Sequence, residues 1–285
     1  MGEKDITEKV LEDHNDVFAD IINGLLFAGE QRVLPEALEN TGIHSQYKAE
    51  DEKVHELERD VAKYWKEREV QLAICGIENQ STIEKNMPFR ISGYDGAAYR
   101  SQLQQNRKKI LPVVTIVLYF GTDRHWRSGK NIKSLLEIPA GLDEYVSDYQ
   151  IKVFEVAWLS EEQISHFRSD FRIVANFFVN KRKNKDYIPD DPTEIRHVDE
   201  VLKLLQVMTG DERYKQIFQK KKGVRSMCDV AERLEKRGIE KGIEIGRTKE
   251  KKKVYKNLLK EGFSEEKAKR LVGLSDNSKV KDFKI

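Results

Sequence analysis

The chain has 285 residues, of which 39% are hydrophobic and 35% charged, and its mean hydropathy is −0.66. This composition excludes a membrane-embedded protein and a disordered polymer, and no apolar run approaches the ~20 residues of a membrane span. The N-terminal segment is acidic and lacks the apolar stretch of a secretory signal, so we expect a cytoplasmic protein.

The charges are distributed unevenly along the chain. The formal net charge is +2, but residues 1–60 carry 6 Lys and Arg against 16 Asp and Glu, a balance of −10. Residues 211–256 carry 16 against 8, a balance of +8. This asymmetry is typical of a protein that concentrates carboxylates in one part and meets a polyanion with another. Solvated helix faces would give the same pattern, so both interpretations stay open.

The periodicity of apolar residues predicts helices and strands in the first two thirds of the chain. In chain order these are a helix over residues 5–28, a hairpin over 60–80, a helix over 86–108, and strands over 110–121 and 149–159. The strand over 110–121 is apolar at nearly every position, as expected of an interior strand that is covered on both faces.

From Glu161 onward the pattern is helical. Residues 186–193 contain two prolines and form the best candidate for a linker. Gly238, Gly242 and Gly246 share one helical stripe, which suggests close helix packing or local flexibility. Residues 254–283 are expected to form two or three short helices. Gly262 is expected to end the first of them, and Ser264 to cap the next.

Cysteine and histidine spacings do not predict a zinc site. Cys75 and Cys228 lie far apart without a CxxC pattern, and the six histidines never occur at HxxxH spacing. We therefore expect any metal ion to be held by oxygen ligands.

One pair of carboxylates has the arrangement of such a site. Glu78 and Gln80 share the face of a strand that turns from apolar to polar at its end. If Asp60 lies on the neighbouring strand of the hairpin, its carboxylate can approach that of Glu78. Two carboxylates this close favour a bound cation, and Mg²⁺ or Mn²⁺ prefers oxygen ligands. An Asp at a strand start and a Glu at a strand end also occur without a metal.

Several short motifs in a fixed order resemble a known family. They are Arg59-Asp60-Val61, Gly76-Ile77-Glu78-Asn79-Gln80-Ser81, Met87-Pro88-x-Arg90 with Tyr94, Pro112-Val113-Val114-Thr115-Ile116-Val117, and Tyr119-Phe120-Gly121. Together they resemble the Rpn family, the recombination-promoting nucleases of the PD-(D/E)XK superfamily, over most of residues 10–180. The repeat over residues 238–246 is also similar to the carboxyl end of such proteins.

The resemblance implies an α/β fold with a restriction-endonuclease-like core, in which helices flank a mixed central sheet, followed by an all-helical C-terminal extension. It assigns Asp60 as the first catalytic acid and Glu78 as the second, and both as metal ligands. Asn79 would offer its backbone carbonyl to the metal. Gln80 stands where the superfamily commonly has lysine, so it can orient water by hydrogen bonding but cannot supply positive charge.

The resemblance also points to residues outside these strands. Asp20 resembles an additional catalytic acid on the first helix, although Asp16 lies on the same helical face and either could point inward. Arg90 is expected to bind a phosphate, with a structural salt bridge as the alternative. Tyr94, one turn further, could take part in substrate binding, but interior packing is the better-supported expectation.

The family and the charge pattern together predict a Mg²⁺- or Mn²⁺-dependent DNA endonuclease linked to recombination or transposition. The alternative is an inactive DNA-binding or assembly protein that retains the nuclease fold.

We expect a nuclease-like core over residues 1–185, a linker and helical segment over 186–225, and a basic helical tail over 226–285. That tail could form a homo-oligomer or, with the lysine runs at 181–185, 220–222 and 249–253, bind DNA phosphates. Each run could equally be a solvated surface.

Overall fold

The computed structural model describes residues 11–40, 45–48, 54–57, 61–77, 84–105, 109–127, 129–219 and 223–273. Contacts between residues divide the chain into two compact units, Met1–Asp229 and Val230–Ile285, which are described separately. The functional boundaries expected after residues 185 and 225 stay predictions.

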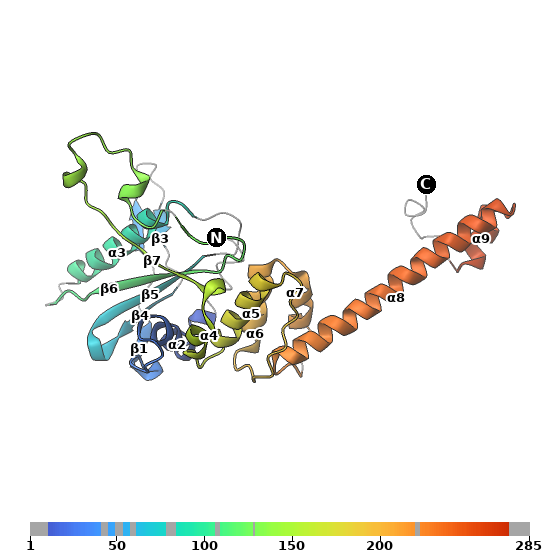
Figure 1. Cartoon of the computed structure of the whole chain (residues 1–285), viewed down its shortest axis with the longest axis horizontal. Coiled ribbons are helices and arrows are strands. Elements are labelled where there is room, and N and C mark those ends of the chain that lie inside the picture. The colour runs from blue at the N-terminus through green and yellow to red at the C-terminus, as the bar shows by residue number, and fades with distance from the viewer. Residues whose placement is uncertain are drawn as a thin grey trace. The chain divides into compact units, whose positions relative to one another are not determined.

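A mixed five-stranded sheet forms the centre of the first unit (Figure 1). Its spatial order is β1-β4-β5-β6-β7; β1, β4 and β5 pair antiparallel, whereas β5, β6 and β7 pair parallel. The strands are β1 (Leu38–Asn40), β4 (Val61–Trp65), β5 (Val70–Ile77), β6 (Val113–Tyr119) and β7 (Lys152–Glu155). A separate antiparallel pair consists of β2 (Ser45–Lys48) and β3 (Val54–Leu57). The expected mixed α/β architecture is confirmed.

β4 and β5 form the hairpin that the sequence predicts. A short 3-10 helix, Lys66–Arg68, connects them, and Glu69 follows in the left-handed conformation with φ of 50°. Val61 pairs with Ile74. The tight connection fixes this register, so the start of β4 lies beside the last residues of β5.

β6 is an interior strand, as its continuous apolar sequence predicts. It begins at Val113 rather than at Ile110, because Pro112 has no N–H to donate to a neighbouring strand. β7 is also shorter than expected. It spans Lys152–Glu155, and the chain then turns into a 3-10 helix over Val156–Trp158.

Helices cover both faces of the sheet (Figure 1). α3 (Met87–Gln104) lies on one face, and α2 (Asn15–Leu26) with α5 (Phe171–Lys183) lies on the other. α4 (Glu161–Ser165) precedes α5 and begins with a capping box, in which Ser160 and Gln163 each accept the backbone N–H of the other. The part of the first predicted helix before residue 11 lies outside the described residues.

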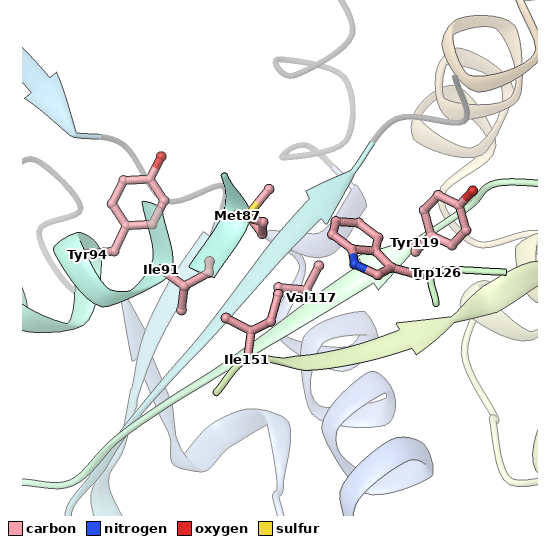
Figure 2. Close-up of a cluster of buried hydrophobic side chains, with 7 residues drawn as sticks. All are labelled: Met87, Ile91, Tyr94, Val117, Tyr119, Trp126 and Ile151. Atoms are coloured by element: carbon pink, nitrogen blue, oxygen red, sulfur yellow. The ribbon is translucent and has the colours of Figure 1, made fainter. Parts of the chain in front are cut away.

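An apolar cluster joins α3 to the sheet (Figure 2). Its buried members are Met87, Ile91, Tyr94, Val117, Tyr119, Trp126 and Ile151. The rings of Tyr119 and Trp126 meet edge to face with their centroids 5.4 Å apart. Full burial of such side chains contributes about 1.5–3 kcal/mol each, so this cluster fixes α3 on its face of the sheet. Asp95 of α3 adds a polar tie, because it accepts a hydrogen bond from Thr115 of β6 at 2.6 Å.

A buried lysine ties β4 to the start of α2 on the opposite face. The side chain of Lys63 is 0% exposed. Its ammonium donates to the backbone O of Asp13 at 2.8 Å and to Oδ1 of Asn40 at 2.6 Å, and it forms an ion pair with the Asp13 carboxylate at 3.1 Å. A buried ammonium is tolerated only with such partners, so these contacts determine where the chain enters α2.

Two further helices complete the first unit. α6 (Val198–Thr209) and α7 (Glu212–Gln219) pack together, and Tyr214 of α7 meets Phe177 of α5 edge to face at 6.1 Å. The carboxylate of Asp170, which is 3% exposed, accepts the backbone N–H groups of Arg196 and His197 directly before α6. The segment between α5 and α6 contains no helix or strand.

The last two helices differ from the sequence expectation. α8 is a single helix over Met227–Lys260, so the expectation of a separate short helix from Val254 is wrong. Helical spacing continues through the glycine stripe, and a Cβ at Gly238, Gly242 or Gly246 would meet no described atom within 4 Å. Packing against other described residues therefore does not explain these glycines.

The end of α8 follows the predicted capping chemistry. Gly262 adopts a φ of 86°, and its N–H donates to the O of Leu259. Ser264 then caps α9 (Glu265–Leu271) by accepting the N–H of Lys267 at 3.4 Å. The expected roles of Gly262 and Ser264 are confirmed. Among the helices described, none combines the length and the apolar character that crossing a bilayer requires.

We expect Lys63→Ala to lower the free energy of unfolding by about 2–5 kcal/mol, because it removes a buried side chain and leaves Asp13 and Asn40 without their donor. Lys66→Ala is the matched control. Lys66 pairs with Glu39 at the surface, with 47% of its side chain exposed, and should cost about 1 kcal/mol or less. Urea denaturation measures both, and equal losses would contradict the role given to Lys63.

Candidate functional site

Four strand ends meet at one edge of the sheet. β5, β6 and β7 run parallel, so their carboxyl ends lie together, with Ile77, Tyr119 and Glu155 in one row across the strands. β4 runs antiparallel to β5, so its amino end at Val61 reaches the same edge. We call this the carboxyl edge. Polar groups that follow parallel strands converge at such an edge, where α/β proteins commonly bind ligands.

The principal predicted site residues lie outside the described residues. These are Asp60, Glu78, Asn79 and Gln80. Their described neighbours are Val61, which follows Asp60, and Ile77, which precedes Glu78. Both neighbours belong to the carboxyl edge.

A histidine–glutamate pair lies at the carboxyl edge beside β7. Glu155, with 17% of its side chain exposed, accepts the backbone N–H of Trp126 at 2.8 Å, and its other oxygen contacts Nδ1 of His125 at 2.5 Å. Lys130 approaches the same carboxylate at 3.9 Å. The carboxylate orients the imidazole, whose side chain is 41% exposed, in the manner of a positioned acid–base group.

Trp158 packs this pair against the end of β6. Its indole N–H donates to the O of Gly121 at 3.1 Å, and its ring lies 3.6 Å from the ring of His125. The guanidinium of Arg182 lies over the indole at 4.3 Å and donates to the O of Ala157. Arg182, one of the cations expected to bind phosphates, thus has its side chain engaged in this packing.

Gly121 has a steric reason to be glycine. A Cβ at this position would lie 2.0 Å from the ring of Tyr119, whose hydroxyl donates to the O of Arg124. Burial raises the pKa of that hydroxyl. The Tyr119-Phe120-Gly121 motif therefore folds the chain tightly at the end of β6 and directs the following residues along the carboxyl edge.

Asp20 faces the interior of the first unit and is 5% exposed. Its carboxylate accepts the backbone N–H of Arg168 at 2.9 Å and that of Ser169 at 2.7 Å. Burial raises the pKa of Asp20, although the hydrogen bonds from Ser169 and Arg168 oppose this effect. The structure thus gives Asp20 an anchoring contact between α2 and the start of α5. Its expected catalytic role stays a prediction.

Asp16, the other acid of the same helical face, contacts His197. The two carboxylate oxygens lie 3.1 and 3.2 Å from Nε2 of His197, and Arg196 approaches at 3.9 Å. Burial acts to raise the pKa of Asp16, but the hydrogen bond and the charge of His197 outweigh it, so the pKa lies below its ordinary value.

Arg90 and Tyr94 lie together on α3. The guanidinium of Arg90 donates to the hydroxyl of Tyr94 at 3.1 Å. Tyr94 is 6% exposed and belongs to the apolar cluster of Figure 2, which confirms the expectation that it packs in the interior. Arg90 is exposed, and its role in binding phosphate stays a prediction.

Sequence reasoning missed the histidines. His125 and Glu155 are separated by 30 residues, and Asp16 and His197 by 181, so no local spacing connects them. The one available signal was the His14-x-Asp16 pair, which places two potential ligands at the start of a predicted helix.

We expect Asp20→Ala to lower the free energy of unfolding by about 2–4 kcal/mol, because two partly buried N–H groups lose their acceptor. Glu30→Ala, which removes an exposed acid, should cost about 1 kcal/mol or less.

A raised carboxyl pKa adds stability that is fully present below the ordinary value of 3.8 and lost as the pH rises through the folded-state value. Asp20→Asn cannot bind this proton. Its free energy of unfolding should therefore lack the decrease that the wild-type protein shows as the pH rises from the ordinary to the folded-state pKa. Unchanged stability with lost nuclease activity would instead assign Asp20 a direct catalytic role.

Comparison with known proteins gives one match. Residues 71–208 match the family model described as "Putative transposase, YhgA-like". Glu78, Asn79, Gln80 and Arg90 fall inside the matched segment, whereas Asp60 precedes it. No curated protein and no solved structure matches the chain. Residues 71–208, slightly less than half of the chain, are thus similar to the YhgA-like putative transposases, in agreement with the resemblance that the sequence motifs indicate.

Proposed function

We propose that this protein is a metal-dependent DNA endonuclease with a restriction-endonuclease-like core, acting in recombination or transposition. The family match over residues 71–208 supports a transposition-related nuclease that interacts with DNA. The mixed sheet with helices on both faces is compatible with such a core.

The observation that best supports the proposal is the antiparallel pairing of β4 with β5 at the carboxyl edge. Asp60 is joined to the amino end of β4, and Glu78 to the carboxyl end of β5. Because these two strands are antiparallel neighbours, both ends belong to the same edge. Two carboxylates carried there from adjacent strands would share one site. A parallel arrangement of β4 and β5 would have placed them at opposite edges.

The donor set fits Mg²⁺ or Mn²⁺. In the proposal, Asp60 and Glu78 supply carboxylate oxygens and Asn79 a backbone carbonyl, all hard ligands of the kind that these ions prefer. When bound, the ion activates a water molecule and offsets the charge of the phosphate. Gln80 hydrogen-bonds the attacking water and orients it. Arg90 holds a phosphate oxygen of the substrate.

The cations that follow the core supply affinity for DNA without sequence selectivity. Lys249, Lys251 and Lys253 are exposed on α8. Lys220, Lys221 and Lys222 lie outside the described residues. Contacts between lysines and phosphates release counterions, so we expect DNA binding to weaken steeply with salt.

One observation favours a second candidate, an inactive DNA-binding or assembly protein. Gln80 occupies the position at which the wider superfamily commonly has lysine, so the proposed site lacks one positive charge. The two candidates differ in whether purified protein cuts DNA when Mg²⁺ is added.

We expect Asp60→Ala and Glu78→Ala each to reduce Mg²⁺-dependent nicking of a supercoiled plasmid by orders of magnitude, because each removes a metal ligand. Folding and DNA affinity should change little. Glu67→Ala is the control, since Glu67 is an exposed acid in the connection between β4 and β5. Full activity in either ligand variant would contradict the assignment, and an inactive wild-type protein that still binds DNA would favour the second candidate.

Gln80→Lys should retain or increase nicking, because lysine adds the positive charge that the superfamily commonly uses. Gln80→Ala should lose less activity than Asp60→Ala, since it removes only a hydrogen bond to water. Single-turnover rates at saturating DNA compare the three variants. If Gln80→Lys were as inactive as Asp60→Ala, the orienting role of Gln80 would be wrong.

A further inference from the structure

Two histidines and a carboxylate converge where the start of α2 meets the start of α6. His14 directly precedes α2, Asp16 lies in its first turn, and His197 directly precedes α6. One ligand atom from each lies within 4.8 Å of the others. All three residues belong to the first unit and are partly buried.

The geometry of the cluster is close to that of a metal centre. Nε2 of His197 lies 3.1 and 3.2 Å from the two oxygens of Asp16, and Nε2 of His14 lies 3.6 Å from Oε1 of Glu200. In a tetrahedral zinc site the bonds to nitrogen and oxygen are about 2.0–2.2 Å long, which separates neighbouring ligand atoms by about 3.3–3.6 Å. The ligand atoms of the cluster lie within 4.8 Å of one another, so side-chain rotations could bring them to the separations of such a site.

The two imidazole rings are stacked, with their centroids 3.8 Å apart and an angle of 23° between their planes. An imidazole ring nitrogen is among the commonest metal ligands in proteins. The stack thus presents two nitrogen donors side by side, next to a carboxylate.

The backbone around the cluster is held in place independently of any ion. Asp170, a buried carboxylate, accepts the backbone N–H of His197 at 2.6 Å and that of Arg196 at 3.1 Å. Asn15, between His14 and Asp16, donates its side-chain amide to the O of Pro35 at 3.0 Å. Ligands on a fixed backbone lose little entropy when they bind an ion.

Nearby charges are compatible with a cation. The positive ends of α2 and α6 disfavour it, but Asp16 and Glu200 in the first turns of these helices offset them. Arg196 approaches Asp16 only at 3.9 Å, and its side chain is 70% exposed, so an incoming ion would displace a weak ion pair.

We propose that His14, Asp16 and His197 form a transition-metal site, with Glu200 available as a fourth ligand, that binds Zn²⁺ and joins α2 to α6. Imidazole and carboxylate ligands suit Zn²⁺ better than Mg²⁺, which prefers oxygen alone. The site is therefore distinct in ligand chemistry from the proposed nuclease centre, and it does not depend on the proposed function. Its role is structural, because a bound ion stabilises the folded chain.

The test is Zn²⁺ binding to the full-length protein after treatment with a chelator. Asp60→Ala serves as the background, so that the proposed nuclease centre does not contribute. Competition with a chromophoric chelator gives affinity and stoichiometry, and thermal unfolding with and without Zn²⁺ gives the stabilisation. Co²⁺ absorption reports whether the ion has nitrogen ligands in a tetrahedral field.

We expect one equivalent of Zn²⁺ per chain and a raised melting temperature. His14→Ala, Asp16→Asn and His197→Ala should each weaken Zn²⁺ binding by about 100-fold or more, since loss of outer partners alone costs 10–100-fold. His166→Ala is the matched control and should bind as before. His14 is more exposed than His197, so His14→Ala provides a folded variant if His197→Ala does not fold. Equal Zn²⁺ affinity in His14→Ala and in the control, or no binding to any of these proteins, would overturn the proposal.

Discussion

The position of β5 between an antiparallel and a parallel neighbour is the constraint on which the proposed site depends. Because β5 pairs antiparallel with β4, β5 ends at the same edge of the sheet at which β4 begins. Its parallel pairing with β6, and that of β6 with β7, adds two more carboxyl ends to this edge. A shift of one residue in the β4–β5 register would turn the side chains of either strand to the other face.

The helices make this sheet a rigid support. α3 is held by an apolar cluster and by the contact of Asp95 with Thr115, whereas α2 is held by polar anchors at its start and in its middle. Lys63 fixes the entry to α2, and Asp20 fixes its middle against the start of α5. Both anchors are buried charges with several partners. Such groups add little net stability, but removal of one partner is costly, so they define one arrangement of the helix.

The sequence predicts the local features well and the long-range ones poorly. The hairpin, the interior strand β6 and the caps at Gly262 and Ser264 follow from side-chain period and turn chemistry within a few residues. The length of α8 was misjudged because the helical period does not change where short helices were expected to begin. The end of β7 was also missed, since the residues after Glu155 stay apolar while the backbone turns.

The candidate site shows the same division. Asp60 and Glu78 are predicted from strand alternation and family motifs, and their assignment stays a prediction. The contacts of Asp20 with Arg168 and Ser169 span more than 140 residues of chain and leave no pattern in the sequence. The same holds for the pairing of His125 with Glu155 and for the cluster of His14, Asp16 and His197. Tertiary folding alone creates these groups, and only the structure brings them together.

The most direct test of the central claim is anomalous diffraction from crystals of the wild-type protein grown with Mn²⁺. We predict an anomalous peak at the carboxyl edge, between the residues that precede β4 and those that follow β5, with Asp60 and Glu78 as ligands. The peak should vanish in Asp60→Ala while the fold remains. The absence of an ion from this edge under conditions in which the protein nicks DNA would contradict the account.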